Sequence, residues 1–169
     1  MVYSKKRGYK ALGLTNNSIK KCILAVPARL ESSRLPNKII LDVGGKPMIQ
    51  RVLERCRNTS NSMKVVLCTD NKKLEKLAMS INIPILFTPK ECNSGSERLS
   101  TVIDKLVGIA WEKDLENLDY KNKRELISQT GIINVQGDQP FIEPSILIKM
   151  ENFEKFLHCL LSRKQKEMK

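Results

Sequence analysis

Three cationic side chains lie close together in one short segment of the chain. Arg29, Arg34 and Lys38 follow a continuous apolar run at residues 22–28. Cations beside backbone N–H groups neutralise phosphate oxygens, and an arginine can do so through two parallel hydrogen bonds. This segment therefore predicts a triphosphate site. A solvated basic loop is the alternative, and a position directly after a strand favours the phosphate site.

A second segment with possible chemistry runs from Asn93 to Arg98. Ser94 or Ser96 can cap a helix that begins here, and Glu97 suits the first turn of that helix. A helix N-terminus can also bind an anion or the edge of a base. Capping alone explains the pattern, so this segment is a weak signal by itself.

The third segment places an acidic side chain at the tip of a turn. Gly137 and Asp138 follow an apolar run at residues 132–135. A glycine lets the backbone turn closely, and a carboxylate is a ligand that Mg²⁺ prefers when it bridges phosphates. The segment predicts a magnesium site, and an ordinary Gly-Asp turn is the alternative.

Alternating strand and helix patterns must position these three segments. Apolar runs predict strands, and apolar residues at helical spacing predict helices. The predicted strands cover 22–28, 63–69, 83–87 and 132–135, and the predicted helices cover 47–58, the segment capped by Asp70 or Asn71, 95–111 and 144–157. This order predicts an α/β protein with a mostly parallel sheet flanked by helices on both faces. In such sheets ligands bind beyond the carboxyl ends of the strands, where all three segments fall.

The remaining parts of the chain carry most of its charge. Residues 1–21 hold half of the net charge of +12 and predict a basic, disordered leader, with an organellar address as the lesser alternative. Residues 112–130 are charged and weakly periodic, and predict a surface insertion in a nucleotide-binding domain at 22–157. Residues 158–169, with the single histidine His158, form an atypical tail for which a surface helix is expected.

Composition also limits the classes of function. No apolar run reaches the ~18–20 residues of a membrane-spanning helix, and the leader lacks the apolar stretch of a secretory signal. Five cysteines without a C-x-x-C pair favour reduced, buried thiols, so we expect a cytoplasmic protein. Nucleic-acid binding is disfavoured because aromatic residues are few and no reading motif is present.

The three segments together resemble the 3-deoxy-manno-octulosonate (Kdo) cytidylyltransferases, also called CMP-Kdo synthetases. The motifs that carry the resemblance appear in the family's order: Pro-Ala-Arg at 27–29, Ser-Arg-Leu-Pro-Asn-Lys at 33–38, Gly-Lys-Pro-Met-Ile at 45–49, Cys-Thr-Asp at 68–70, Ser-Gly-Ser-Glu-Arg at 94–98 and Asn-Val-Gln-Gly-Asp-Gln-Pro at 134–140. The resemblance covers about residues 22–155. It implies the N-terminal portion of a nucleotidyltransferase fold of the glycosyltransferase-A-like type.

The resemblance also implies an activity and a set of site residues. The reaction would transfer CMP from CTP to Kdo and release pyrophosphate, as a step in lipopolysaccharide precursor synthesis. By position, the residues that would bind and polarise the triphosphate are Ala28, Arg29, Arg34 and Lys38, with Arg29, Lys38 and Asp138 as the catalytic residues. Ser94, Arg98 and Gln136 would lie around the cytidine and the sugar, and Asp138 would hold Mg²⁺.

Two features depart from the family pattern. Residue 139 is Gln where the family has Glu, for which we expect a modest effect. Family members also continue well beyond the Gln-Gly-Asp turn, into a part that supplies most of the sugar pocket, much of a homodimer interface and a second carboxylate for the metal. We therefore expect a truncated or frameshifted member that is inactive or weakly active alone. A CTP-binding remnant without catalysis, or a cytidylyltransferase for neuraminate or another acidic sugar, remains the alternative.

Overall fold

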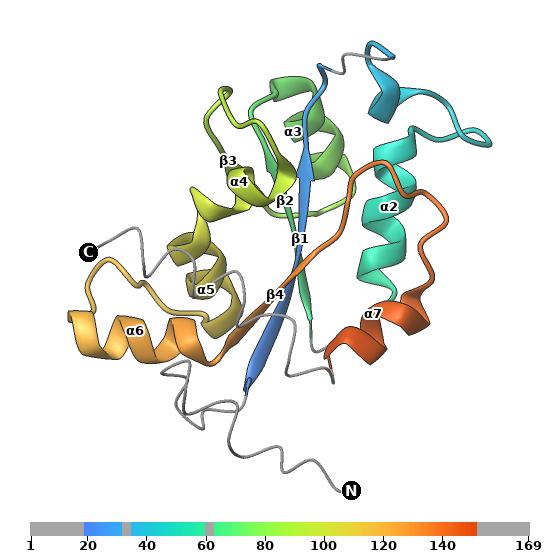
Figure 1. The fold of residues 1–169 in the computed structure, drawn as a ribbon. Helices are drawn as coiled ribbons and strands as arrows, with labels where there is room; N and C mark the ends of the chain where they lie inside the picture. The colour runs from blue at the N-terminus through green and yellow to red at the C-terminus, as the bar shows by residue number, and fades with distance from the viewer. Residues whose placement is uncertain (1–18, 32–34, 60–62, 152–169) are drawn as a thin grey trace, which may run out of the picture.

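Four parallel strands form a single sheet in the computed structural model of the chain, which describes residues 19–31, 35–59 and 63–151 (Figure 1). The strands are β1 (Lys21–Ala28), β2 (Lys64–Thr69), β3 (Ile85–Phe87) and β4 (Thr130–Asn134). Their spatial order is β3-β2-β1-β4, and every neighbouring pair is parallel. The predicted fold class is therefore confirmed.

β1 is a central strand because its side chains are apolar on both faces of the sheet. Leu24 and Val26 point into one core cluster, and Ile23 and Ala25 point into another. β2 alternates in the same way, with Leu67 in the first cluster. A strand that is buried on both faces reads as a continuous apolar run, as the sequence of β1 does.

Helices cover both faces of the sheet (Figure 1). α2 (Met48–Arg57), α3 (Lys72–Ser80) and α7 (Pro144–Glu151) contribute Leu53, Leu74 and Leu147 to the first cluster. α4 (Gly95–Ser100) and α5 (Ile103–Trp111) contribute to the second cluster, against which α6 (Tyr120–Ser128) also packs. A 3₁₀ helix, η1 (Lys38–Ile40), precedes α2.

Several details differ from the sequence-based expectations. The predicted helix at 95–111 is two helices that are separated at Thr101 and Val102, and the predicted insertion at 112–130 contains α6. β1 begins at Lys21, which we had placed in the leader, and Asn71 rather than Asp70 caps α3. The rest of the leader up to residue 18, the end of the last predicted helix and the tail lie outside the described residues.

The described cysteines agree with the expectation of buried, reduced thiols. Cys22, Cys56, Cys68 and Cys92 are free and buried. Among the helices that the structure describes, none is both long enough and apolar enough to cross a membrane.

Candidate active site

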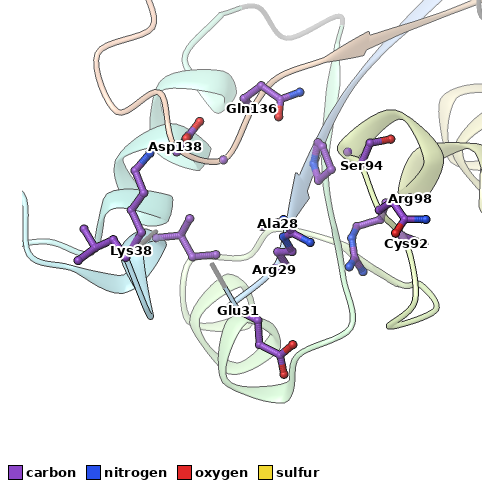
Figure 2. A pocket seen from close by; sticks show the side chains of 15 residues that line it. Ala28, Arg29, Glu31, Lys38, Cys92, Ser94, Arg98, Gln136 and Asp138 are labelled. Carbon is purple, nitrogen blue, oxygen red and sulfur yellow. Dashed lines mark hydrogen bonds and ion pairs between the residues drawn. The ribbon is translucent and has the colours of Figure 1, made fainter. Parts of the chain in front are cut away.

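A cavity of about 460 Å³ lies at the carboxyl end of the sheet, where the segments that follow β1, β3 and β4 meet (Figure 2). The carboxyl ends of parallel strands lie at the same edge of a sheet, so segments that are distant in the sequence meet there. At this edge Ala28 of β1 pairs with Thr69 of β2. Val135, directly after β4, donates its N–H to the carbonyl of Ala25 in β1. The lining residues are Pro27, Ala28, Arg29, Glu31, Leu35, Lys38, Ile39, Cys92, Asn93, Ser94, Gly95, Arg98, Gln136, Gly137 and Asp138.

Most of the predicted site residues line this one cavity. They are Ala28, Arg29, Lys38, Ser94, Arg98, Gln136 and Asp138. Arg34 lies outside the described residues. The seven residues therefore lie around one site, and the role of each stays a prediction.

One side of the cavity holds an ion pair between the first and third predicted segments. Lys38 Nζ lies 2.7 Å from Asp138 Oδ2, and both side chains are more than one-third exposed. Figure 2 shows the two side chains pointing toward each other, with Arg29 and Ala28 between this pair and the opposite wall. Cations and a carboxylate at one place suit a metal-bound polyphosphate, because the cations bind phosphate oxygens and the carboxylate binds the metal.

Two glycines allow the surrounding segments to approach closely. A Cβ atom on Gly95 would lie 2.9 Å from Pro27 Cγ, and one on Gly137 would lie 3.1 Å from Ile49 Cδ1 and 3.2 Å from the carbonyl oxygen of Pro27. The distance at Gly95 is too short for a carbon atom in a well-packed core, and those at Gly137 would require the neighbouring atoms to shift by a few tenths of an ångström. Because these two residues have no side chain, the segments that contain them can pack directly against the end of β1.

The wall formed by α4 begins with a helix cap. The Ser94 hydroxyl accepts a hydrogen bond from Glu97 N–H at 3.1 Å, and Glu97 Oε2 accepts one from Asn93 N–H at 2.8 Å. This pattern is close to a capping box, in which both side chains satisfy backbone donors at the start of a helix. The predicted cap at Ser94 is confirmed, and Ser94 still borders the cavity.

Arg98 lines the cavity and is also the most buried charged residue of the site. Its guanidinium group donates to Thr88 Oγ1 and to the carbonyl of Pro89, and it faces the carboxylate of Asp70. Several of its donors are thus used within the protein. The family resemblance implies only a ligand-binding role for Arg98, and its partners within the protein were not predicted.

Sequence reasoning missed three polar residues of this region. Glu31 lines the cavity, and its carboxylate pairs with Lys90, in the loop after β3, at 3.0 Å. This hydrogen bond and charge raise the pKa of Lys90. Cys92 is buried in the wall, and Asp70 pairs with Arg98 at 3.5 Å. The pair of Glu31 and Lys90 could not be predicted, because exposed residues in distant loops do not follow the periodic pattern of a helix or a strand.

Comparison with known proteins identifies the family. The model of a family described as Cytidylyltransferase matches residues 23–156, which include every segment of the cavity. The chain belongs to the cytidylyltransferase family.

Relatives of this cytidylyltransferase chain carry more specific names. The chain is 35% identical over 131 residues to 3-deoxy-manno-octulosonate cytidylyltransferase 1 of Actinobacillus pleuropneumoniae serotype 5b, covering 77% of this chain and 45% of the relative. It is 34% identical over 142 residues to the 3-deoxy-manno-octulosonate cytidylyltransferase of Francisella tularensis subsp. holarctica, covering 84% of this chain and 47% of the relative. The chain thus spans about half the length of these relatives.

Solved structures agree with this assignment. A CMP:2-keto-3-deoxy-manno-octonic acid synthetase complexed with CTP matches with a TM-score of 0.60 and 31% identity, over 78% of this chain and 46% of that one. A cytidylyltransferase from Leptospira borgpetersenii matches with a TM-score of 0.53 at 23% identity, which supports the fold alone.

The magnesium ion that the family resemblance implies fits the described residues in part. Asp138 offers a carboxylate at the cavity, and Mg²⁺ is often held by one or two carboxylates together with substrate phosphates and water. Within 19–31, 35–59 and 63–151, no group of three or more acidic, histidine or cysteine side chains could hold a metal by itself.

Proposed function

We propose that this cavity binds CTP with Mg²⁺ and takes part in the transfer of CMP from CTP to Kdo, with release of pyrophosphate. The observation that carries the proposal is the meeting of Arg29, Lys38 and Asp138 at one cavity. Family membership supports the nucleotide, and the names of the relatives support the sugar. The product would serve lipopolysaccharide precursor synthesis in the cytoplasm, and the active form would be a homodimer.

The residues of the cavity have distinct tasks in this reaction. The anomeric hydroxyl of the sugar attacks the α-phosphorus of CTP, and the bond to the pyrophosphate oxygen breaks. Arg29 and Lys38 stabilise the negative charge that develops on the leaving pyrophosphate, with little reorganisation because both are already in place. Asp138 would hold the Mg²⁺ ion, which supplies further positive charge at the phosphates. Removing one such group typically costs about 3 kcal/mol of transition-state stabilisation.

A second candidate function is CTP binding without transfer. The observation in its favour is that Asp138 is the one carboxylate of the described residues that faces Lys38 at the phosphate side of the cavity. A metal held by one protein ligand is poorly fixed, and catalytic geometry tolerates displacements of only about 0.5 Å.

Pyrophosphate release separates the two functions. The purified chain is incubated with CTP and Mg²⁺, with and without Kdo, and the Asp138→Ala variant is compared with Asp104→Ala, which removes a carboxylate outside this cavity. Kdo-dependent release that is lost only in Asp138→Ala supports the transferase. CTP binding without release, from folded protein, supports the binding function. Faster release with neuraminate than with Kdo would assign a different acidic sugar.

A further inference from the structure

The carboxylate of Asp70 lies directly after β2 and pairs with a buried guanidinium. Asp70 Oδ2 is 3.5 Å from Arg98 Nη2, and the two side chains are 17% and 3% exposed. A buried charge without a partner is strongly unfavourable, so the position of Arg98 depends on a nearby negative charge. Arg98 lines the cavity, whereas Asp70 is not among the lining residues and has no role in the proposed reaction.

Arg98 uses its remaining donors to hold the loop that follows β3. Its Nη1 donates to the Thr88 hydroxyl and, at 3.2 Å, to the carbonyl of Pro89. Thr88 N–H in turn donates to the carbonyl of Thr69 at 3.0 Å. The guanidinium therefore joins the end of β2, the loop after β3 and α4 at a single point.

The loop held in this way forms one wall of the nucleotide cavity. Cys92, Asn93 and Ser94 line the cavity directly after the segment that Arg98 holds. Figure 2 shows Cys92, Ser94 and Arg98 together on the side opposite Lys38 and Asp138. We infer that Asp70 is a positioning residue for the nucleotide site: its carboxylate orients Arg98, and Arg98 holds this wall in place for the nucleoside part of the ligand.

A second contact to the same loop is too weak to replace this one. Lys90 pairs with Glu31 at 3.0 Å, but both side chains are mostly exposed. Exposed ion pairs contribute little because solvent screens them and ordering two long side chains is unfavourable. Asp70 and Arg98 are screened far less, so the loop depends on them. The inference that the loop contacts a nucleoside rests on the proposed function. The inference that Asp70 and Arg98 hold the loop does not depend on it.

The first test measures the holding of the loop without any ligand. Peptide-resolved alkylation compares Cys92 in the wall with Cys56, which is buried in α2 far from it in sequence and serves as an internal control. In Asp70→Asn, which keeps the shape but removes the charge, we expect Cys92 to react about tenfold faster, as the loss of a charge-assisted hydrogen bond predicts. Cys56 should be unchanged, and Asp70→Glu should restore part of the protection.

The matched control is Asp104→Asn, which removes the partner of Lys123 at 2.8 Å on α5 and α6. It should leave Cys92 unchanged. An unchanged Cys92 in Asp70→Asn, or an equal rise at Cys92 and Cys56, would overturn the inference. If Asp70→Asn does not fold, Arg98→Lys must expose Cys92 selectively, because an ammonium group cannot bond Asp70, Thr88 and Pro89 together.

The second test measures the ligand. Calorimetry with CMP and with tripolyphosphate separates the nucleoside side of the cavity from the side of Lys38 and Asp138. Asp70→Asn should weaken CMP binding about tenfold and leave tripolyphosphate binding unchanged. Equal weakening of both would show a general structural role and overturn the positioning role. If the unmodified chain binds neither CTP nor CMP, the proposed function fails, while the alkylation result still decides whether Asp70 holds the loop.

Discussion

Lys38 Nζ lies 2.7 Å from Asp138 Oδ2, although the two residues are 100 positions apart in the chain. The Lys38 ammonium group donates to one oxygen of the carboxylate that would bind the metal. The pair is partly exposed, so it contributes at most about 1 kcal/mol and can exchange partners readily. In the proposed function, the Asp138 carboxylate would hold the metal and the Lys38 ammonium group would bind a phosphate of CTP.

This exchange predicts opposite effects of Asp138→Asn with and without metal. With Mg²⁺ present, the variant should bind CTP about tenfold more weakly, because a charged metal ligand is lost. With a chelator present, it should bind CTP at least as tightly as the unmodified chain, because Lys38 is released to the phosphates. Titration calorimetry under both conditions measures the difference.

Two further variants complete this experiment. Lys38→Met should weaken CTP binding in both conditions, since its charge acts on phosphate with or without metal. Lys46→Met is the matched control: Lys46 also forms an ion pair, with Glu54 at 2.8 Å, but it does not line the cavity. This variant should not change CTP binding with Mg²⁺ or with the chelator. An equal loss of affinity by Asp138→Asn in the chelator would show that Asp138 acts on something other than a metal.

Gly95→Ala should affect both stability and binding. The added Cβ would meet Pro27 Cγ at 2.9 Å and the Gln136 side-chain amide at 3.4 Å. Overpacking of this kind typically lowers the free energy of unfolding by about 1–3 kcal/mol. Because Pro27 and Gln136 line the cavity, CTP binding should weaken as well. Urea denaturation and calorimetry measure the two effects.

The matched control for this glycine is Gly108→Ala in α5. Its Cβ would lie 2.8 Å from the carbonyl oxygen of Lys113, away from the cavity. We expect a loss of stability of the same order but unchanged CTP affinity in the fraction that remains folded. If both variants bind CTP as tightly as the unmodified chain, the close packing of Gly95 against Pro27 is not needed for CTP binding.

The strands and the clustering of the site could be predicted because they depend on patterns local to the sequence. β1 is a continuous apolar run, and parallel strands end at one edge, which brings Lys38 and Asp138 together without further information. Partners between loops could not be predicted in this way. The contact of Asp70 with Arg98 depends on how the segment after β2 packs against α4, and neither residue belongs to a periodic pattern that fixes its neighbour.

The helices that were predicted wrongly show what local patterns leave out. Leu99, Val102 and Ile103 form a continuous apolar stripe, which predicts one helix. The chain departs from the helix at Val102, where φ is −126°, after Thr101 Oγ1 donates to the carbonyl of Arg98. Such hydroxyl bonds compete with helical hydrogen bonds. Conversely, α6 has no buried residue and starts at the Asp119 cap, so no apolar stripe indicated it.

Removal of the Ser94 cap should change stability and CTP binding together. Its hydroxyl accepts from Glu97 N–H at 3.1 Å, and an N-cap serine replaced by alanine typically costs about 1 kcal/mol. Ser94 also lines the cavity, so Ser94→Ala should raise the dissociation constant of CTP. Asn71→Ala removes the corresponding cap of α3, which accepts from Lys73 N–H at 2.8 Å outside the cavity. Asn71→Ala should lower the free energy of unfolding by about as much as Ser94→Ala and leave CTP binding unchanged.

Buried thiols should make the fold sensitive to alkaline pH. Burial raises the pKa of Cys56 and of Cys68 from the usual value of 9.0 to about 12 each. Between these values the unfolded chain releases the thiol protons and the folded chain keeps them. The stability that these thiols contribute is therefore fully present below about pH 9 and is lost as the pH rises toward 12. Each thiol should lower the free energy of unfolding by about 1.4 kcal/mol per pH unit in this window.

Cys56→Ala isolates this contribution from the titration of other groups. Urea midpoints are measured under reducing conditions at several pH values on both sides of about pH 9. Because Cys56 is fully buried, the variant should be less stable than the unmodified chain at neutral pH, where it leaves a small cavity. Above pH 9 its stability should fall less steeply, and the two curves should converge. Parallel curves would mean that the Cys56 thiol ionises alike in the folded and unfolded chains, contrary to its burial in α2.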